Sequence, residues 1–207
     1  MANKMSFLEA VENRRSIYPL TDKIPISDAR VQELVTEAIK HVPSSFNSQS
    51  TRLVVLLNEE HQKFWEYVKD VLKPQMPAEN FAQTEGKLNM FKAAHGTILF
   101  LDDPAPVNEL ASKFALYAQH FPGWALQSNA MHQFALWTAL EAEGCGANLQ
   151  HYNPIIDQKA KSEWNIPQEW DLRAQLVFGG PAEGARENLS PKQFQPVEER
   201  VKVYGAK

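Results

Sequence analysis

Apolar residues recur at helical spacing in the first part of the chain. Ser6 and Glu9 have the spacing of a capping box, which predicts a helix from about Ser6 to Arg14. After Ser27, apolar residues occupy positions i, i+3, i+4, i+7 and i+8, which predicts a second helix that ends before Pro43. The buried face of this helix is predicted to comprise Val31, Leu34, Val35, Ala38 and Ile39.

Short apolar runs alternate with helical segments along the rest of the chain. Strands are predicted at 52–57, 96–103 and 171–180, and helices at 59–72, 106–120 and 124–143. A further helix is predicted to begin at Asn153 and Pro154, as cap and first residue, and to continue to Trp164. Because no repeat or linker divides the chain, this alternation predicts one domain over residues 1–207, with a sheet between helical layers.

The segment from Trp124 to Leu140 contains no charged residue. It is short for a bilayer span and contains several amide and hydroxyl side chains, so it predicts a buried helix rather than a membrane partner. A core helix and a subunit-interface helix are both compatible with this pattern.

Composition narrows the function further. The chain has 207 residues, 43% hydrophobic composition and a formal net charge of −4, which argues against a nucleic-acid partner. One cysteine, Cys145, and a first segment without an apolar core predict a reducing, cytoplasmic location.

Several common chemistries lack their motifs. The glycines near Cys145 follow a predicted helix, and Leu149 stands where a dinucleotide fingerprint has its last glycine. The six histidines do not have the spacing of a zinc helix. Cys145 has no basic neighbour to lower its pKa, so the sequence predicts a buried, unreactive thiol and no metal.

Three polar segments remain. Arg14, Arg15 and Ser16 end the first predicted helix, where cations also complement the helix dipole without any ligand. Near the C-terminus, Arg200 and Lys202 alternate with valines, which predicts an extended segment with one basic face. If the two basic groups converge, they suit a phosphate. The third segment is "PSSFNSQSTR", at 43–52, which as an ordinary loop needs only turn chemistry.

Together these segments resemble the FMN-dependent nitroreductase family. The resemblance rests on "RRS" near the N-terminus, the "PSS-x-N-x-Q" loop and the C-terminal basic pair, and "GCGANLQHYNP" is similar to its short fungal and bacterial branch. It implies an α+β fold, a three-layer α-β-α sandwich with a central mixed sheet, and a homodimer with FMN sites at the subunit interface. The chain departs from the family where Ser50 and Thr51 follow Gln49, because a tryptophan is often found there.

The resemblance assigns residues to the FMN site. Arg14, Ser16, Arg200 and Lys202 would hold the phosphate, and Arg15 would lie near the ribityl chain or the pyrimidine edge. The polar loop would approach the flavin from the partner subunit, and the backbone of 147–150 would lie against the ring. The complete set is Arg14, Arg15, Ser16, Ser44, Ser45, Asn47, Gln49, Ala147, Asn148, Leu149, Gln150, Arg200 and Lys202.

The implied activity is an NAD(P)H-dependent oxidoreductase that reduces nitroaromatics, quinones or related acceptors by a ping-pong mechanism. The chemistry would be carried by N5 of FMN, so no catalytic side chain is assigned. Phe81, Phe121 and Trp124 are candidates for an aromatic acceptor pocket. Two alternatives stay open: a non-enzymatic flavin-dependent sensor or regulatory protein, and an anion-binding structural protein without flavin.

Overall fold

The computed structural model describes residues 5–206 of the chain. Its centre is a sheet in which the long strand β5 pairs with β1, β3 and β4, and β2 pairs with β3. The strand order is β1-β5-β3-β2, with β4 off this path. Each of these pairings is antiparallel, and the parallel element is the isolated bridge between Ser16 and Ala147. The strands are β1 (Leu20–Thr21), β2 (Thr51–Leu57), β3 (Gly96–Asp102), β4 (Gly146–Gln150) and β5 (Asp171–Pro181).

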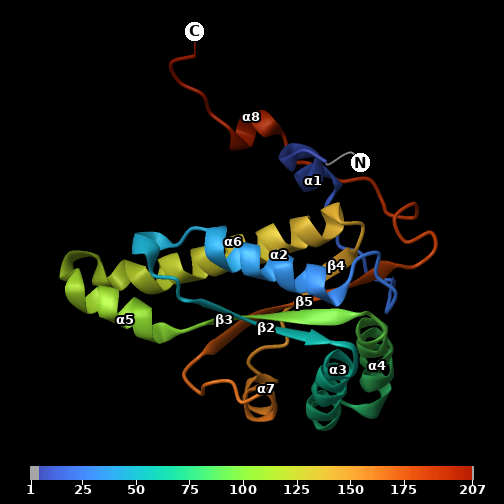
Figure 1. Cartoon of the computed structure of the whole chain (residues 1–207). Coiled ribbons are helices and arrows are strands. Elements are labelled where there is room, and N and C mark those ends of the chain that lie inside the picture. Colours follow the sequence, from blue (N-terminus) through green and yellow to red (C-terminus); the bar gives the residue numbers. More distant parts are fainter. Residues whose placement is uncertain (1–4, 207) are drawn as a thin grey trace.

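Helices cover both faces of the sheet (Figure 1). One layer contains α2 (Asp28–His41), α5 (Pro104–Lys113) and α6 (Phe121–Ala142), and the opposite layer contains α3 (Asn58–Leu72), α4 (Ala78–Lys92) and α7 (Asp157–Glu163). Short helices α1 (Phe7–Asn13) and α8 (Val197–Arg200) lie outside these layers, near both termini. Three 3₁₀ turns complete the elements: η1 (Ser45–Asn47), η2 (Lys73–Gln75) and η3 (Ala115–His120). The α+β three-layer sandwich is confirmed.

The predicted helix starts at Ser6 and Ser27 are confirmed by their caps. The backbone N–H of Ser6 donates to Oε2 of Glu9 at 2.7 Å, and the N–H of Glu9 donates to Oγ of Ser6, which completes the capping box. Ser27 Oγ accepts from the N–H of Arg30 at 3.2 Å. Serine at these positions satisfies amide groups that the first helical turn leaves unpaired.

Two element predictions are wrong, and one helix was missed. The helix predicted from Asn153 begins only at Asp157, after a turn. The basic tail was predicted to be extended, but Arg200 ends the short helix α8, whose first turn carries two glutamates that suit a helix N-terminus. Helix α4 was missed because its apolar residues are widely spaced.

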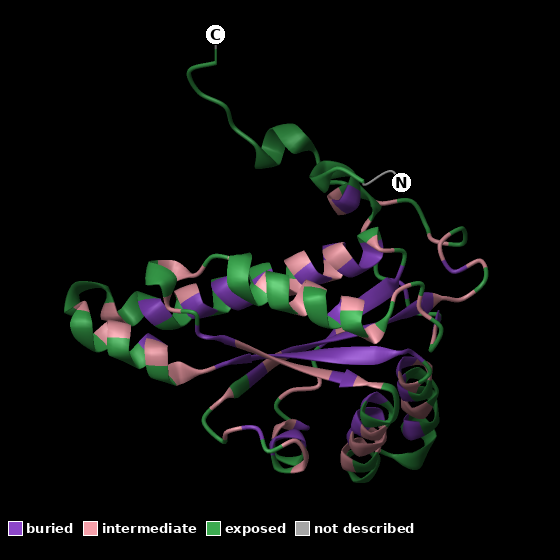
Figure 2. Ribbon diagram, viewed as in Figure 1, coloured by how far each residue is buried: buried purple, intermediate pink, exposed green. Residues whose placement is uncertain are grey.

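Both faces of the sheet are buried, so residues along β3 alternate between two cores (Figure 2). Ile98 and Phe100 pack with residues of α2 and α6, whereas Leu99 and Leu101 pack with residues of α3 and α4. This alternation follows from the two-residue period of a strand. Helix α6 is therefore held against the sheet by its buried residues.

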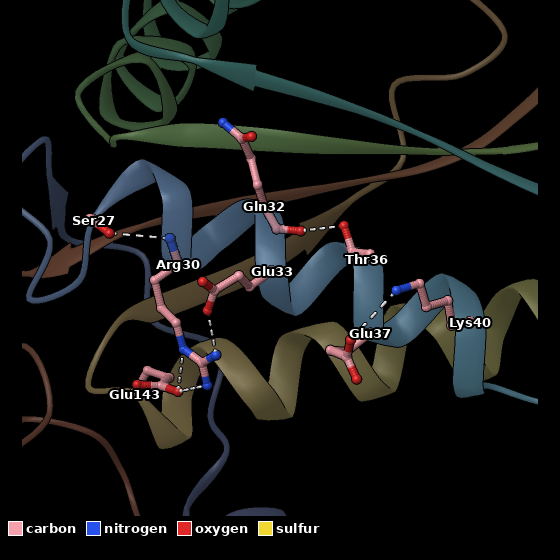
Figure 3. A network of polar contacts seen from close by, with 8 residues as sticks. All are labelled: Ser27, Arg30, Gln32, Glu33, Thr36, Glu37, Lys40 and Glu143. Atoms are coloured by element: carbon pink, nitrogen blue, oxygen red, sulfur yellow. Dashed lines mark hydrogen bonds and ion pairs between the residues drawn. The ribbon is translucent and has the colours of Figure 1, made fainter.

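Polar contacts fasten α2 to the end of α6 (Figure 3). Arg30 donates to Oε1 of Glu143 from Nε at 3.0 Å and from Nη2 at 2.6 Å, and its Nη1 pairs with Glu33. Cys145, just beyond, is fully buried, and burial raises the pKa of its thiol to about 12. The predicted burial of this cysteine is confirmed.

No helix within the described part of the chain combines the length and apolar character needed to cross a membrane. Among residues 5–206, no cluster of three histidine, cysteine, aspartate or glutamate side chains is arranged to hold a metal ion.

Candidate functional site

The basic N-terminal segment lies directly beside β4. The N–H of Ile17 donates to the carbonyl of Ala147 at 2.9 Å, and Nδ2 of Asn148 donates to the carbonyl of Ile17 at 2.9 Å. These bonds hold Ser16 in the parallel bridge with Ala147. Two segments that the family resemblance assigned to one site are therefore adjacent.

Arg14 lies over the indole of Trp137 on α6, with its guanidinium carbon 4.4 Å from the ring centroid. Among residues 5–206, no side chain or backbone group forms a hydrogen bond or ion pair with the Arg14 guanidinium or the Ser16 hydroxyl. A cation supported by an aromatic face and otherwise unbonded keeps its donors available for a ligand.

Two cavities meet at Arg14 and Ser16. One, of about 460 Å³, is also lined by Arg15 and Lys192. The second, of about 350 Å³, extends along α6 and is lined by Trp137 and by Leu149 of β4. Phe134 lines both cavities. The site thus has a cationic end next to an apolar wall.

Arg15 lines the cationic end and also bonds to other segments of the chain. Its Nη2 donates to the carbonyl of Ser190 at 2.6 Å, and its backbone N–H donates to Oε2 of Glu141 at 3.1 Å. The side chain also borders a third cleft of about 800 Å³, lined in addition by Arg186 and Lys192. Arg15 therefore anchors the segment that leads to the C-terminus while remaining at the edge of the cationic end.

Most of the β4 residues assigned to the FMN site have buried side chains. Ala147, Asn148 and Gln150 are buried, and Nε2 of Gln150 donates to Oδ1 of Asn148 at 2.8 Å. Of the four residues, only Leu149 lines a cavity that is described here. Contact between the backbone of 147–150 and the flavin ring stays a prediction.

The polar loop is ordered by its own bonds. Ser44 Oγ accepts from the N–H of Gln49 at 3.0 Å, and the carbonyls of Ser44 and Ser45 accept from two N–H groups within η1. Phe46, Asn47 and Gln49 all have positive φ, between 48° and 54°. Left-handed backbone is costly for a bulky residue, so the surrounding structure must hold Phe46 in place.

An aromatic cluster supports Phe46. Its ring stacks on Trp124 at 6.0 Å and contacts Phe114 at 5.0 Å and Phe121 at 5.3 Å between ring centroids. Phe46 itself stays half exposed. Phe121, which is buried, and Trp124 both belong to this cluster, whereas Phe81 is buried in α4 in the opposite helical layer. The acceptor pocket stays a prediction.

The two halves of the predicted site are separated along α6. Phe46 and the aromatic cluster adjoin Trp124, and Ser44 and Gln49 of the polar loop line a small cavity with His132 of α6. Arg14 adjoins Trp137, thirteen residues beyond Trp124. At 1.5 Å per residue this corresponds to ~20 Å. The structure therefore brings Arg14, Arg15, Ser16 and 147–150 together, and it places Ser44, Ser45, Asn47 and Gln49 elsewhere.

The C-terminal basic pair does not reach the cavities within one chain. Lys202 Nζ donates to the carbonyl of Glu198, and the tail extends away from the sheet (Figure 1). Lys192 takes part in the cationic end instead, and its Nζ also contacts the carbonyl of Glu12. Sequence reasoning missed Lys192, because an isolated lysine in a polar stretch carries no signal.

The chain matches the sequence pattern of the Nitroreductase family over residues 11–180. The chain belongs to the nitroreductase family. The nitroreductase FRM2 of Saccharomyces cerevisiae is 35% identical over 179 residues, covering 85% of this chain and 88% of that protein. Nitroreductase CinD from Lactococcus lactis, solved in complex with 4-nitrophenol, is 43% identical, has a TM-score of 0.85 and covers 96% of this chain and 100% of the other.

A more distant structure, from Desulfovibrio desulfuricans in complex with FMN, shares the fold at 20% identity, with a TM-score of 0.66 and coverage of 99% and 100%. Nitroreductase family members bind FMN, so the cofactor expected from the resemblance is that of the family. Family membership also supports an oxidoreductase.

Proposed function

We propose that this nitroreductase is an FMN-dependent oxidoreductase that uses NADH or NADPH to reduce nitroaromatics, quinones or related acceptors. Residues 1–207 act as one FMN-binding domain in this proposal. The observation that carries it is the cavity at Arg14, where a guanidinium without a hydrogen-bond partner among residues 5–206 lies beside β4 and the apolar face of α6.

The cationic end fits the FMN phosphate. Arg14 and Lys192 supply charged donors, and Ser16 supplies a hydroxyl that suits a remaining phosphate oxygen. Because Arg14 and Ser16 have no other bonding partner in residues 5–206, binding a phosphate does not require them to give up an existing contact.

The apolar end fits a flat ring. Leu149 and Phe134 border the second cavity, and Trp137 lies at its base beneath Arg14. Bound FMN supplies the redox chemistry, since it accepts electrons from a reduced nicotinamide and passes them to an organic acceptor. The chain holds the ring, excludes water from one side of it and leaves room for one substrate at a time. Successive use of the same space is the basis for ping-pong kinetics.

The ~20 Å separation along α6 supports a homodimer. The exposed stripe of α6 between Trp124 and Trp137 is free of charge and includes Leu126, Met131 and Phe134, each at least 40% exposed. If two copies pair these stripes about a two-fold axis, the polar loop of one meets Arg14 of the other. A large uncharged surface of this kind is typical of a permanent subunit interface.

The C-terminal tail, residues 200–204, would also contribute to the site in the proposed dimer. Val201, Val203 and Tyr204 are exposed in the single chain, and Tyr204 is 90% exposed. We propose that the tail packs onto the second copy and there brings Arg200 and Lys202 to a phosphate. The extended backbone after α8 gives this segment the reach to do so.

The aromatic cluster is the proposed acceptor pocket. In the dimer, Phe46 would lie over the flavin site of the other subunit, beside Ser44 and Asn47. Its half-exposed ring provides a stacking surface for a planar acceptor. A nitrophenol bound to the Lactococcus lactis protein is an acceptor of this shape.

A spectroscopic experiment tests the proposed function. Purified protein, supplied with FMN, should show visible flavin bands that bleach on anaerobic addition of NADH or NADPH and return on addition of 4-nitrophenol or a quinone. Bound flavin that never bleaches would instead indicate the sensor role. A protein that does not bind FMN would contradict the proposal entirely.

A further inference from the structure

Glu141 is a buried carboxylate near the end of α6. Its side chain is 2% exposed, and burial raises its pKa above the ordinary value for a glutamate. Three donors compensate for the cost of burial: the N–H of Arg15 at 3.1 Å, Nε1 of Trp137 at 2.8 Å and Nη1 of Arg186 at 3.3 Å. These donors come from three separate segments of the chain.

Each donor also holds part of the proposed FMN site. Trp137 supports the guanidinium of Arg14 at 4.4 Å. The backbone of Arg15 fixes the turn between Arg14 and Ser16. Arg186 donates from Nη2 to the carbonyl of Cys145 at 2.7 Å, immediately before β4. One carboxylate therefore links the aromatic support, the basic turn and the approach to β4.

We propose that Glu141 is a positioning residue for FMN, which sets the place of Arg14 and Ser16 without touching the cofactor. This inference rests on the proposed function, because it assumes that those two residues bind the phosphate. Its function differs from that of an ordinary buried ion pair, since its partners converge on one end of a ligand site.

Glutamine cannot replace the carboxylate. Oε1 of Glu141 accepts from Trp137, and Oε2 accepts from Arg15 and Arg186. A glutamine would have only one oxygen, so its NH₂ group would face a donor on one side. Either Trp137 or the Arg15 backbone would lose its acceptor, and the alignment at Arg14 would change.

The chain offers a matched control two residues away. Glu143 also binds an arginine at the end of α6, but its partner is Arg30 of α2, and it lines none of the three cavities (Figure 3). Glu143→Gln therefore weakens a more exposed ion pair at the same end of α6, without altering the segments that hold Arg14.

The experiment compares the affinities of FMN and riboflavin, which lacks the phosphate, for the full-length native protein, Glu141→Gln and Glu143→Gln. We expect Glu141→Gln to weaken FMN binding about tenfold or more, since charge-assisted bonds depend on alignment. Riboflavin affinity should change by no more than about twofold, as should both affinities in Glu143→Gln. Arg186→Gln removes a charged donor to Glu141 at a residue that lines neither cavity at Arg14, and it should show the same selective loss if Glu141→Gln does not fold.

Other results would overturn the inference. Equal loss of FMN and riboflavin affinity in Glu141→Gln would show a general structural role, and unchanged FMN affinity would show no role at the site. If Glu141→Gln does not fold, the same two results in Arg186→Gln would overturn it. These results leave native FMN binding intact and so leave the proposed function standing. Failure of the native protein to bind FMN would overturn both.

Discussion

The buried His61 should make the folded protein less stable in mild acid. The imidazole is fully buried between α3 and β3, with Nδ1 2.8 Å from Oγ1 of Thr97 and Nε2 3.1 Å from the carbonyl of Phe91. Thr97 already accepts from Nε1 of Trp65 at 3.0 Å, so its own proton is free to be donated to Nδ1. This network fits the neutral imidazole, protonated at Nε2. A second ring proton would require the Thr97 hydroxyl to turn its own proton away, and it would place a charge in a buried site.

The magnitude follows from the pKa. Burial, assisted by the nearby His95, lowers the pKa of His61 from the ordinary 6.5 to about 4. Between these values the unfolded chain binds more protons than the folded chain, so stability falls as the pH falls. The contribution is fully present above pH 6.5, and its complete loss near pH 4 corresponds to about 3 kcal/mol, of which about 2 kcal/mol is lost by pH 5.

Denaturant unfolding at several pH values between 7.5 and 5 measures this effect. The reference is His61→Gln, whose amide can still donate to the Phe91 carbonyl but does not titrate. The variant will be less stable at neutral pH, but its free energy of unfolding should depend less on pH, and the difference between the two proteins should narrow by about 2 kcal/mol at pH 5. Parallel pH profiles for the two proteins would refute the reasoning.

Three further predictions concern the site. Arg200→Ala combined with Lys202→Ala should increase FMN loss on dilution much more than it lowers the melting temperature, since each charged bond to phosphate contributes roughly 1.5–3 kcal/mol. Full flavin occupancy in this double variant would contradict the proposed phosphate contacts of Arg200 and Lys202. Met131→Asp should give a monomer in light scattering, and an unchanged dimer would place the interface elsewhere. Phe46→Ala should raise KM for 4-nitrophenol several-fold with a smaller effect on NAD(P)H, which steady-state kinetics can separate; equal effects on both would exclude a role in acceptor binding.

Helix caps and buried strands could be predicted from the sequence because their signals are local. Ser6 and Ser27 act on amides within three residues, and the run along β3 is apolar throughout because both of its faces are covered. Helix α4 could not be found in this way, since Phe81, Leu88 and Phe91 are its buried residues and most of the other residues are exposed. Its position depends on packing against α3.

In the candidate site, too, features with a local sequence pattern could be predicted and features that depend on distant contacts could not. The motif around Arg14 and the β4 segment were identified from a resemblance that depends on residue type, and the structure places them side by side. The roles of Lys192, Trp137 and Glu141 depend on contacts between segments far apart in the sequence, and no local pattern encodes them. Arg15 illustrates the difference, because its identity suited a ligand contact while its Nη2 binds the carbonyl of Ser190.

Helix α6 keeps the two ends of the proposed site apart within one chain. Its buried face packs against the sheet through Leu136 and Leu140, so the helix cannot bend to bring Trp124 toward Trp137. A ligand that needs both the aromatic loop and the basic turn must therefore obtain one of them from another molecule. Because the stripe between them is uncharged and exposed, a second copy related by a two-fold axis meets this requirement at both ends at once. Dimer formation and cofactor binding should then be lost together, and Met131→Asp should release FMN even though Met131 lines neither of the two cavities at Arg14.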